Sequence, residues 1–373
     1  PQLVNLSYTD AGGANVVYSE GGLYNRIGMT SNRFLTQSRT AFYITDEMKF
    51  DRWRFDVGFR IENTKGTFRN GGLTDTQVYD NPDLTTELST VRYADGSFTT
   101  GEVDATDWAV SLAGLYELTE STNLYANFSK GYFIPQLRGF APVPGIRDTK
   151  YDMEKILQGE IGAKFVTPKF SGTAALFYVG LSDRIKITQA IVGGELVDQA
   201  RSTQATRTFG LEATANYRFT DDLSAFATFT YQDHEITENL QEDLTNNTSS
   251  EANVGNELAR QPNILGTLGL NYDNKKFDAL ISVNHTGSKF TDDTNNVELD
   301  AISIFRLGGG YTFETQGSST LRVGFSVFNL FDSAGLTEGN PRAGIAGQSG
   351  DGDFFVGRPI LPRRFFITTT FNF

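Results

Sequence analysis

Hydrophobic and polar residues alternate along long segments of this chain. From Trp53 to Ile61 the odd positions are aromatic or aliphatic, whereas the even positions are charged residues or glycine. Successive side chains of a β-strand point to opposite faces of its sheet, so this period of two predicts strands with one apolar and one polar face. The same alternation runs through residues 108–118, 124–132, 209–219, 277–285 and 321–327.

The predicted strands are joined by two unequal kinds of connection. Short polar turns are expected at residues 50–52, 119–122, 166–169, 220–222 and 273–276, with a slightly longer one at 314–319. Long polar connections are expected at residues 66–104, 135–155, 188–206, 237–257, 291–296 and 333–359. The strands have about ten residues or more, which is the length that crosses a bilayer at a tilt. Short periplasmic turns and long extracellular loops are typical of outer-membrane barrels.

The expected fold is therefore all-β, a transmembrane antiparallel β-barrel. The alternation predicts about thirteen strands between Phe34 and the C-terminus. Bacterial single-chain barrels have an even number of strands. We therefore expect at least one upward strand before Phe34, for which the candidates are Leu3 to Tyr8 or a stretch not present here.

Composition and charge exclude several other classes of protein. The mean hydropathy is −0.31 and no stretch has the apolar length of a membrane helix, but a barrel averages to the same value because its two faces alternate. The absence of cysteine excludes disulfides, thiolate metal sites and a cysteine nucleophile. The net charge of −13 argues against a general nucleic-acid-binding protein.

The C-terminal segment predicts a closing strand with a lipid-facing side. Phe365, Ile367, Thr369, Phe371 and Phe373 share one face, and the chain ends on phenylalanine. An apolar face ending in aromatic rings suits the lipid head-group level. This ending also resembles the signal by which outer-membrane barrels are recognised for assembly, and we assign that role to Phe371 and Phe373.

Four short segments, in this order, resemble the barrel domain of TonB-dependent outer-membrane receptors. They read LYANFSKGYFIP from residue 124, GEIGAKF from residue 159, RTFGLE from residue 207 and VFNLFD from residue 327. The family has a 22-stranded barrel that encloses an N-terminal plug. The resemblance thus implies that residues 1–373 are the C-terminal portion of such a barrel, with about 13–14 of its strands and without the plug. A complete barrel of fourteen strands is the alternative.

The resemblance implies active uptake of a scarce nutrient at the outer membrane of a Gram-negative bacterium. The implied energy source is the TonB complex, acting through the plug, and no segment here resembles the box that engages TonB. A ferric siderophore is the favoured nutrient, with a glycan or another organic nutrient as a close second. The other implied partners are outer-membrane lipid and the barrel assembly machinery. Neither a cofactor nor enzymatic activity is expected. A passive porin-like or structural barrel is the alternative function.

Two sets of residues could contact other molecules. Aromatic rings and guanidinium groups near the expected extracellular mouth could bind sugar rings or anionic metal chelates, and the alternative for each aromatic residue is a girdle or loop packing. These substrate-binding candidates are Tyr132, Phe133, Gln136, Arg138, Phe140, Phe354, Phe355 and Arg358. Polar residues on the other strand face would line the lumen, in ion pairs or in contact with a plug. These are Arg54, Asp56, Arg60, Glu62, Glu212 and Arg218.

No metal site is expected. The two histidines, His234 and His285, are interpreted as interfacial or loop residues because no partners for a metal or haem site can be located. The acidic runs 292–296 and 351–353 raise the possibility of calcium, but neither fits the twelve-residue calcium loop. The glycine run 308–310 lacks the setting of a phosphate loop and indicates a bend or a close approach of backbone.

Overall fold

The computed structural model describes the chain apart from residues 1–2, 5–6, 10–11, 14, 18–22, 25–32, 78–89, 134–152, 193–194, 244–247, 316–318 and 343–353. Its elements are β1 (Leu3–Val4), β2 (Ser7–Thr9), β3 (Asn15–Val17), β4 (Leu23–Tyr24), β5 (Arg33–Phe50), β6 (Trp53–Gln77), β7 (Thr90–Thr119), β8 (Thr122–Phe133), β9 (Glu154–Val166), β10 (Phe170–Val192), β11 (Glu195–Arg218), β12 (Leu223–Asp243), β13 (Thr248–Glu251), β14 (Ile264–Asp273), β15 (Phe277–Thr286), β16 (Lys289–Phe290), β17 (Glu298–Leu299), β18 (Ile302–Glu314), β19 (Thr320–Phe328), β20 (Leu336–Arg342), β21 (Phe354–Pro359) and β22 (Arg364–Asn372). Within these ranges, no helix is long and apolar enough to cross a membrane.

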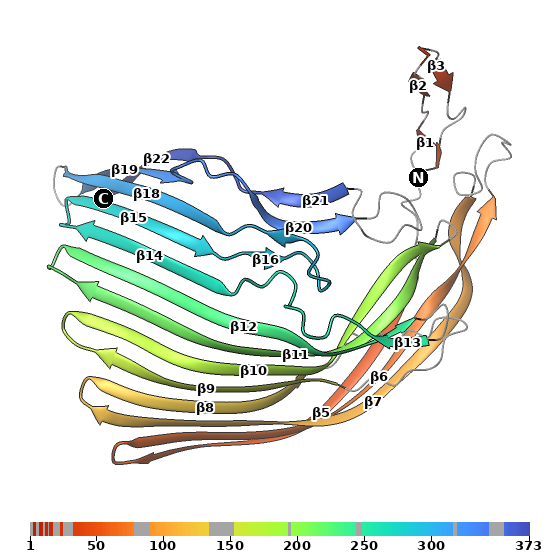
Figure 1. The fold of residues 1–373 in the computed structure, drawn as a ribbon, viewed down its shortest axis with the longest axis horizontal. Coiled ribbons are helices and arrows are strands. Elements are labelled where there is room, and N and C mark those ends of the chain that lie inside the picture. The colour runs from red at the N-terminus through yellow and green to blue at the C-terminus, as the bar shows by residue number, and fades with distance from the viewer. Residues whose placement is uncertain are drawn as a thin grey trace.

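The main structure is a 14-stranded antiparallel sheet, which confirms the predicted all-β fold. Thirteen of its strands pair in sequence order from β5 to β22, and β13 pairs with β12 off this path. Figure 1 shows that the sheet is curved, with the short turns together at one end of the strands, at the left. At the other end, β6, β7, β10 and β11 continue beyond their neighbours and bend away.

The predicted short turns are confirmed, whereas several predicted loops are strands. β5 and β6 are joined by Asp51 and Arg52 alone, and Asp51 has a φ of 50° that allows this tight reversal. In the expected connection 66–104, however, β6 runs on to Gln77 and β7 starts at Thr90. Paired strands likewise occupy most of residues 188–206 and parts of 237–257 and 333–359. Two strands satisfy each other's backbone groups wherever they run, so a polar hairpin in water needs no alternating sequence.

Of the two candidates for a preceding upward strand, Leu3–Tyr8 is wrong. β1 pairs with β4, and β2 pairs with β3, in two separate two-stranded sheets. Neither is hydrogen-bonded to the large sheet in the described part of the chain. These pairs are too short to cross a bilayer, which needs about ten residues in a tilted strand.

One face of the large sheet is apolar and exposed. Ile61 lies opposite Trp108 in the register of β6 and β7, and their side chains are 40% and 46% exposed. Aromatic rings on this face gather beside the short turns, as in the pairs Trp53–Tyr116 and Tyr217–Phe219, whose centroids are 4.5 and 4.9 Å apart. Rings at this level are typical of a membrane interface.

On the polar face, aromatic rings lie over glycines of the neighbouring strand. A Cβ atom added to Gly162 would lie 2.6 Å from Cζ of Tyr125, and one added to Gly210 would lie 2.3 Å from Cζ of Phe177. Only glycine leaves room for these rings. Gly162 of the segment GEIGAKF and Gly210 of the segment RTFGLE thus have a packing role.

Candidate functional site

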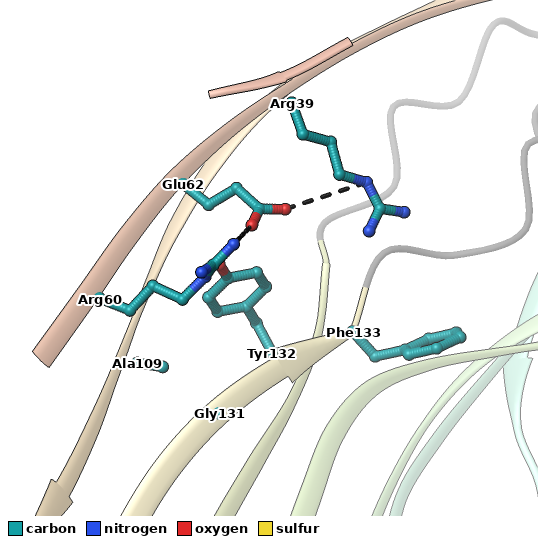
Figure 2. Close-up of a pocket in the computed structure, with 7 residues that line it drawn as sticks. All are labelled: Arg39, Arg60, Glu62, Ala109, Gly131, Tyr132 and Phe133. Carbon is teal, nitrogen blue, oxygen red and sulfur yellow. Dashed lines mark hydrogen bonds and ion pairs between the residues drawn. The ribbon is translucent and has the colours of Figure 1, made fainter. Parts of the chain in front are cut away.

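A cavity of about 370 Å³ lies where β5, β6, β7 and β8 meet (Figure 2). Charged and aromatic side chains from three of these strands line it, together with two small residues. The lining residues are Arg39, Arg60, Glu62, Ala109, Gly131, Tyr132 and Phe133.

Glu62 is the centre of the polar contacts in this cavity. Its carboxylate forms an ion pair with the Arg60 guanidinium, and its Oε1 lies 4.0 Å from Nε of Arg39. The Thr64 hydroxyl donates a hydrogen bond to the same oxygen at 3.3 Å. The Tyr132 ring lies beside the Arg60 guanidinium (Figure 2). The Glu62 side chain is only 5% exposed, whereas those of Arg39 and Arg60 are 55% and 44% exposed, so both cations remain open to a ligand.

Strand register places the three charged residues on one face. The two-residue turn after Phe50 sets Ala41 opposite Glu62 and Arg39 opposite Thr64. Because side chains alternate, Arg39, Arg60 and Glu62 all lie on the polar face, away from Ile61.

The β8 side of the cavity forms where two strands separate. The pairing of β7 with β8 ends at Val110 and Lys130, whereas β8 continues to Phe133 beside β9. Lys130 donates to Oδ1 of Asp107 at 2.5 Å and lies 4.0 Å from the centroid of the Trp108 ring. Tyr132 and Phe133 lie just beyond this point and contribute the aromatic wall (Figure 2).

Charge and shape define what this cavity can bind. Two guanidinium groups against one carboxylate leave one positive charge in excess, and guanidinium groups bind carboxylates and similar oxyanions through paired N–H donors. The Tyr132 and Phe133 rings supply apolar surface beside that charge. Across the described residues, no group of acidic and histidine side chains has the arrangement of a metal site.

Comparison with known proteins identifies the family. The model of the TonB-dependent receptor-like β-barrel matches residues 2–330 of this chain. The chain belongs to the TonB-dependent receptor β-barrel family. The predicted resemblance to this family is thereby confirmed, and the family consists of transport receptors.

Individual members of the TonB-dependent receptor family show how much of a receptor this chain represents. It is 24% identical over 274 residues to the rhizobactin receptor of Rhizobium meliloti (strain 1021), covering 67% of this chain and 33% of that protein. It superimposes on the unliganded ferric citrate transporter FecA with a TM-score of 0.66 at 19% identity, covering 96% of this chain and 49% of FecA. The ferric yersiniabactin receptor FyuA from Yersinia pestis gives 0.65 at 19% identity, with 91% and 46% covered. The chain thus spans a third to a half of the receptors it matches.

Within this TonB-dependent receptor chain, the cavity joins residues from both predicted sets. Tyr132 and Phe133 were predicted at the substrate mouth, and Arg60 and Glu62 in the lumen, yet all four line one cavity. Sequence reasoning missed Arg39, although its register position opposite Thr64 follows from the short turn at residues 51–52.

The remaining predicted residues lie elsewhere in the receptor chain. Arg54 forms ion pairs with Glu47 at 3.2 Å and Asp56 at 3.6 Å near the β5–β6 turn. Arg218 lines a second cavity, of about 690 Å³, beside the β9–β10 turn. Arg358 pairs with Glu338 at 3.3 Å between β20 and β21. Glu212 is exposed on β11, Phe354 and Phe355 start β21, and Phe371 stacks with Phe373 at 6.1 Å. Gln136, Arg138 and Phe140 lie outside the described residues.

The two histidines of the receptor chain differ in their surroundings. His285 contacts the Ser303 hydroxyl through Nδ1 at 2.9 Å and is half-buried. His234 was expected at an interface or in a loop, but it lies in β12 and is 1% exposed. Its burial arises because the segment that follows β13 folds back over the polar face, a long-range contact with no local signal in the sequence.

Proposed function

We propose that this chain belongs to an outer-membrane receptor of a Gram-negative bacterium that takes up a scarce nutrient with energy from TonB. The cavity of Arg39, Arg60, Glu62, Tyr132 and Phe133 binds an anionic ligand that also carries rings or apolar groups. A ferric siderophore is the favoured class, with a glycan or another organic nutrient second. The excess positive charge of the cavity is the observation that carries this proposal. The similarity of the chain to the rhizobactin, ferric citrate and ferric yersiniabactin proteins supports it.

The proposal includes the place of the chain in a larger barrel. Residues 1–373 form the C-terminal portion of a 22-stranded barrel, and the TonB complex acts through a plug supplied by another part of the receptor. Two observations support this: β5 and β22 are the two edge strands of the described sheet, and the chain covers 49% of FecA. The apolar face contacts outer-membrane lipid, and the strand ending in Phe371 and Phe373 is read by the assembly machinery.

Ligand binding to the full-length receptor tests the function. Ferric carboxylate and hydroxamate chelates, and neutral oligosaccharides as the alternative class, are titrated against the purified protein, with protection of its loops from proteolysis as a second readout. We expect an anionic ferric chelate to bind, and Arg60→Gln to weaken it about tenfold through loss of a charge-assisted contact. If neither class binds or protects the loops, the uptake function is refuted. Steady ion conductance of the full-length protein in a planar bilayer would favour the porin-like alternative.

A further inference from the structure

Residues 252–263, here called the strap, complete the edge of β12. The pairing of β12 with β14 stops at Tyr231 and Ile264, although β12 continues to Asp243. Beyond that point the strap supplies the hydrogen bonds: the Ile236 amide donates to the Asn256 carbonyl at 2.8 Å, and the Gly255 amide donates to the Ile236 carbonyl at 2.8 Å. The strap is therefore docked on the sheet by backbone contacts.

A second segment, residues 291–297, holds the strap from the other side, and we call it the brace. Oδ1 of Asp293 accepts a hydrogen bond from the Ala259 amide at 3.3 Å, while Oδ2 accepts one from Nε2 of Gln204 at 3.1 Å. Asn295 accepts from the Glu257 amide at 2.7 Å and donates to the Glu257 carbonyl at 3.0 Å. Strap, brace and β11 are thus joined through polar side chains.

His234 lies beneath the strap and contacts it directly. Nδ1 of His234 accepts a hydrogen bond from the Leu258 amide at 3.1 Å, and Leu258 is itself 5% exposed. A ring nitrogen accepts a hydrogen bond only when it carries no proton, so the docked strap requires a neutral imidazole with its proton on Nε2. Nε2 has no hydrogen-bond partner in the described part of the chain.

Some buried polar atoms under the strap have no hydrogen-bond partner in the described part of the chain. This makes the docking of the strap sensitive to a change of charge. Among the described residues, four buried side-chain atoms lack a hydrogen-bond partner, and all four belong to the strap or to the strands beneath it. They are Oε1 of Gln204, Nε2 of His234, Oδ1 of Asn239 and Oδ1 of Asn263. Each buried polar atom without a hydrogen-bond partner costs free energy. The docked state is therefore easily destabilised when one more hydrogen bond is lost.

We propose that His234 makes the docking of the strap sensitive to acid. A proton taken from water by Nδ1 converts this acceptor into a donor, so two N–H groups face each other and the Leu258 hydrogen bond is lost. The protonated ring is also a charge that burial beneath the strap disfavours. Release of the strap returns the ring to water, where the charge is solvated. The contact is therefore a pH-dependent switch between a docked and a released strap.

Proton linkage gives the sign of the response. The docked strap binds only the neutral ring, because its Nδ1 accepts from the Leu258 amide, whereas the released strap leaves Nδ1 free to bind a proton. The ratio of released to docked strap should therefore rise as the pH falls.

Other charged groups lie on the elements that surround His234. Strand alternation turns Asp233 and Glu235 of β12 to the other face, where Arg207 pairs with Glu235 at 2.8 Å. The charged groups on the elements packed over His234 are Glu257 and Arg260 of the strap, Asp292 and Asp293 of the brace, and Lys289 and Glu298 beside it.

A single spin label can report on the strap, because the chain contains no cysteine. Val254→Cys places the label on the strap at a side chain that is 48% exposed. A label at Glu120→Cys, on the β7–β8 turn, is the control position. Spectra of the full-length receptor, labelled after any cysteine outside residues 1–373 has been replaced by serine, are recorded between about pH 8 and about pH 5. We expect the mobile fraction at residue 254 to rise in acid and the spectrum at residue 120 to stay constant.

Substitutions at the two histidines identify the group that responds. His234→Asn keeps a side-chain acceptor near Nδ1 but cannot take up a proton, so the strap should stay docked across the range. His234→Leu removes the acceptor and should leave the strap mobile at every pH, while His285→Asn should keep the wild-type response. An unchanged wild-type spectrum in acid would overturn the proposal. So would an acid response that survives in His234→Asn, because a carboxylate would then be responsible. This test requires no nutrient, so its outcome is independent of the proposed uptake function.

Discussion

Removing the charge of Glu62 should strengthen the binding of an anionic ligand, whereas removing that of Arg60 should weaken it. Glu62 is the one carboxylate in a cavity that also contains two guanidinium groups. Glu62→Gln keeps the size of the side chain and an oxygen that can accept from Arg60, but it raises the excess charge of the cavity from one to two.

The structure sets the size of this effect. A ligand anion beside Arg60 would lie about 7 Å from the Glu62 carboxylate, which corresponds to a repulsion of about 0.6–2.4 kcal/mol for an effective dielectric constant between 80 and 20. Both arginine side chains are about half exposed, so salt screens part of this energy. We therefore expect Glu62→Gln to strengthen binding roughly 3- to 10-fold and Arg60→Gln to weaken it about tenfold.

Calorimetric titration of the full-length receptor with an anionic ferric chelate, at low and physiological salt, measures both changes. Glu47→Gln is the matched control, because Glu47 also bridges two cations, Lys49 at 2.9 Å and Arg54 at 3.2 Å, at the far end of the same hairpin. It should leave the affinity unchanged. If Glu62→Gln weakens binding as much as Arg60→Gln does, the carboxylate serves to build the cavity and the electrostatic reasoning is refuted.

Four further predictions concern the stability and assembly of the sheet. Gly210→Ala should lower the free energy of unfolding by about 1–3 kcal/mol in a denaturant titration, because the added Cβ would meet the Phe177 ring. Gly159→Ala is the control: the nearest atom to its Cβ is 3.7 Å away, so it should cost much less. Arg322→Lys should lower it by about 1 kcal/mol, because lysine cannot reproduce the paired contacts of 2.9 and 2.6 Å to Asp278; an unchanged denaturation midpoint would contradict this. The Asn63 amide and the Lys65 ammonium lower the pKa of Asp104 in the folded protein. The ionised Asp104 carboxylate should therefore stabilise the fold above about pH 4, and this stabilisation should be lost as the pH falls through the lower folded-state pKa. The melting temperature of Asp104→Asn should lack this fall in acid. A melting temperature that falls in acid as in the wild type would contradict the prediction. Phe373→Ala should reduce the amount of assembled receptor in outer membranes without changing its melting temperature, because this ring is 98% exposed; a lowered melting temperature would point instead to a packing role.

Sequence alone predicts those parts of the fold that depend on local pattern. The alternation after Trp53 places Arg60 and Glu62 opposite in orientation to Ile61, and the two-residue turn before Trp53 fixes which residue of β5 faces each residue of β6. The exposed apolar face and the short turns follow from the same two signals.

The rest of the site depends on where strand pairing stops, and the sequence does not show this. Tyr132 reaches the cavity because the pairing of β7 with β8 ends at the pair Val110–Lys130, although both strands continue beyond this pair. The polar hairpins escaped prediction for a related reason. Strands with water on both faces need no alternation, so their sequences look like those of loops.

The cavity and the strap are two outcomes of the same structural condition. In both places one strand of the sheet loses a neighbour while it continues, before Val110 of β7 and after Tyr231 of β12. An unpaired strand edge must have its polar groups satisfied. At β12 the strap supplies backbone partners and buries His234. At β7 the Lys130 ammonium donates to the Trp108 carbonyl at 2.7 Å, and among the described residues a cavity lies beside this edge. A segment docked against β7 as the strap is against β12 would close the cavity, so the proposed uptake function requires this edge to remain without a strap.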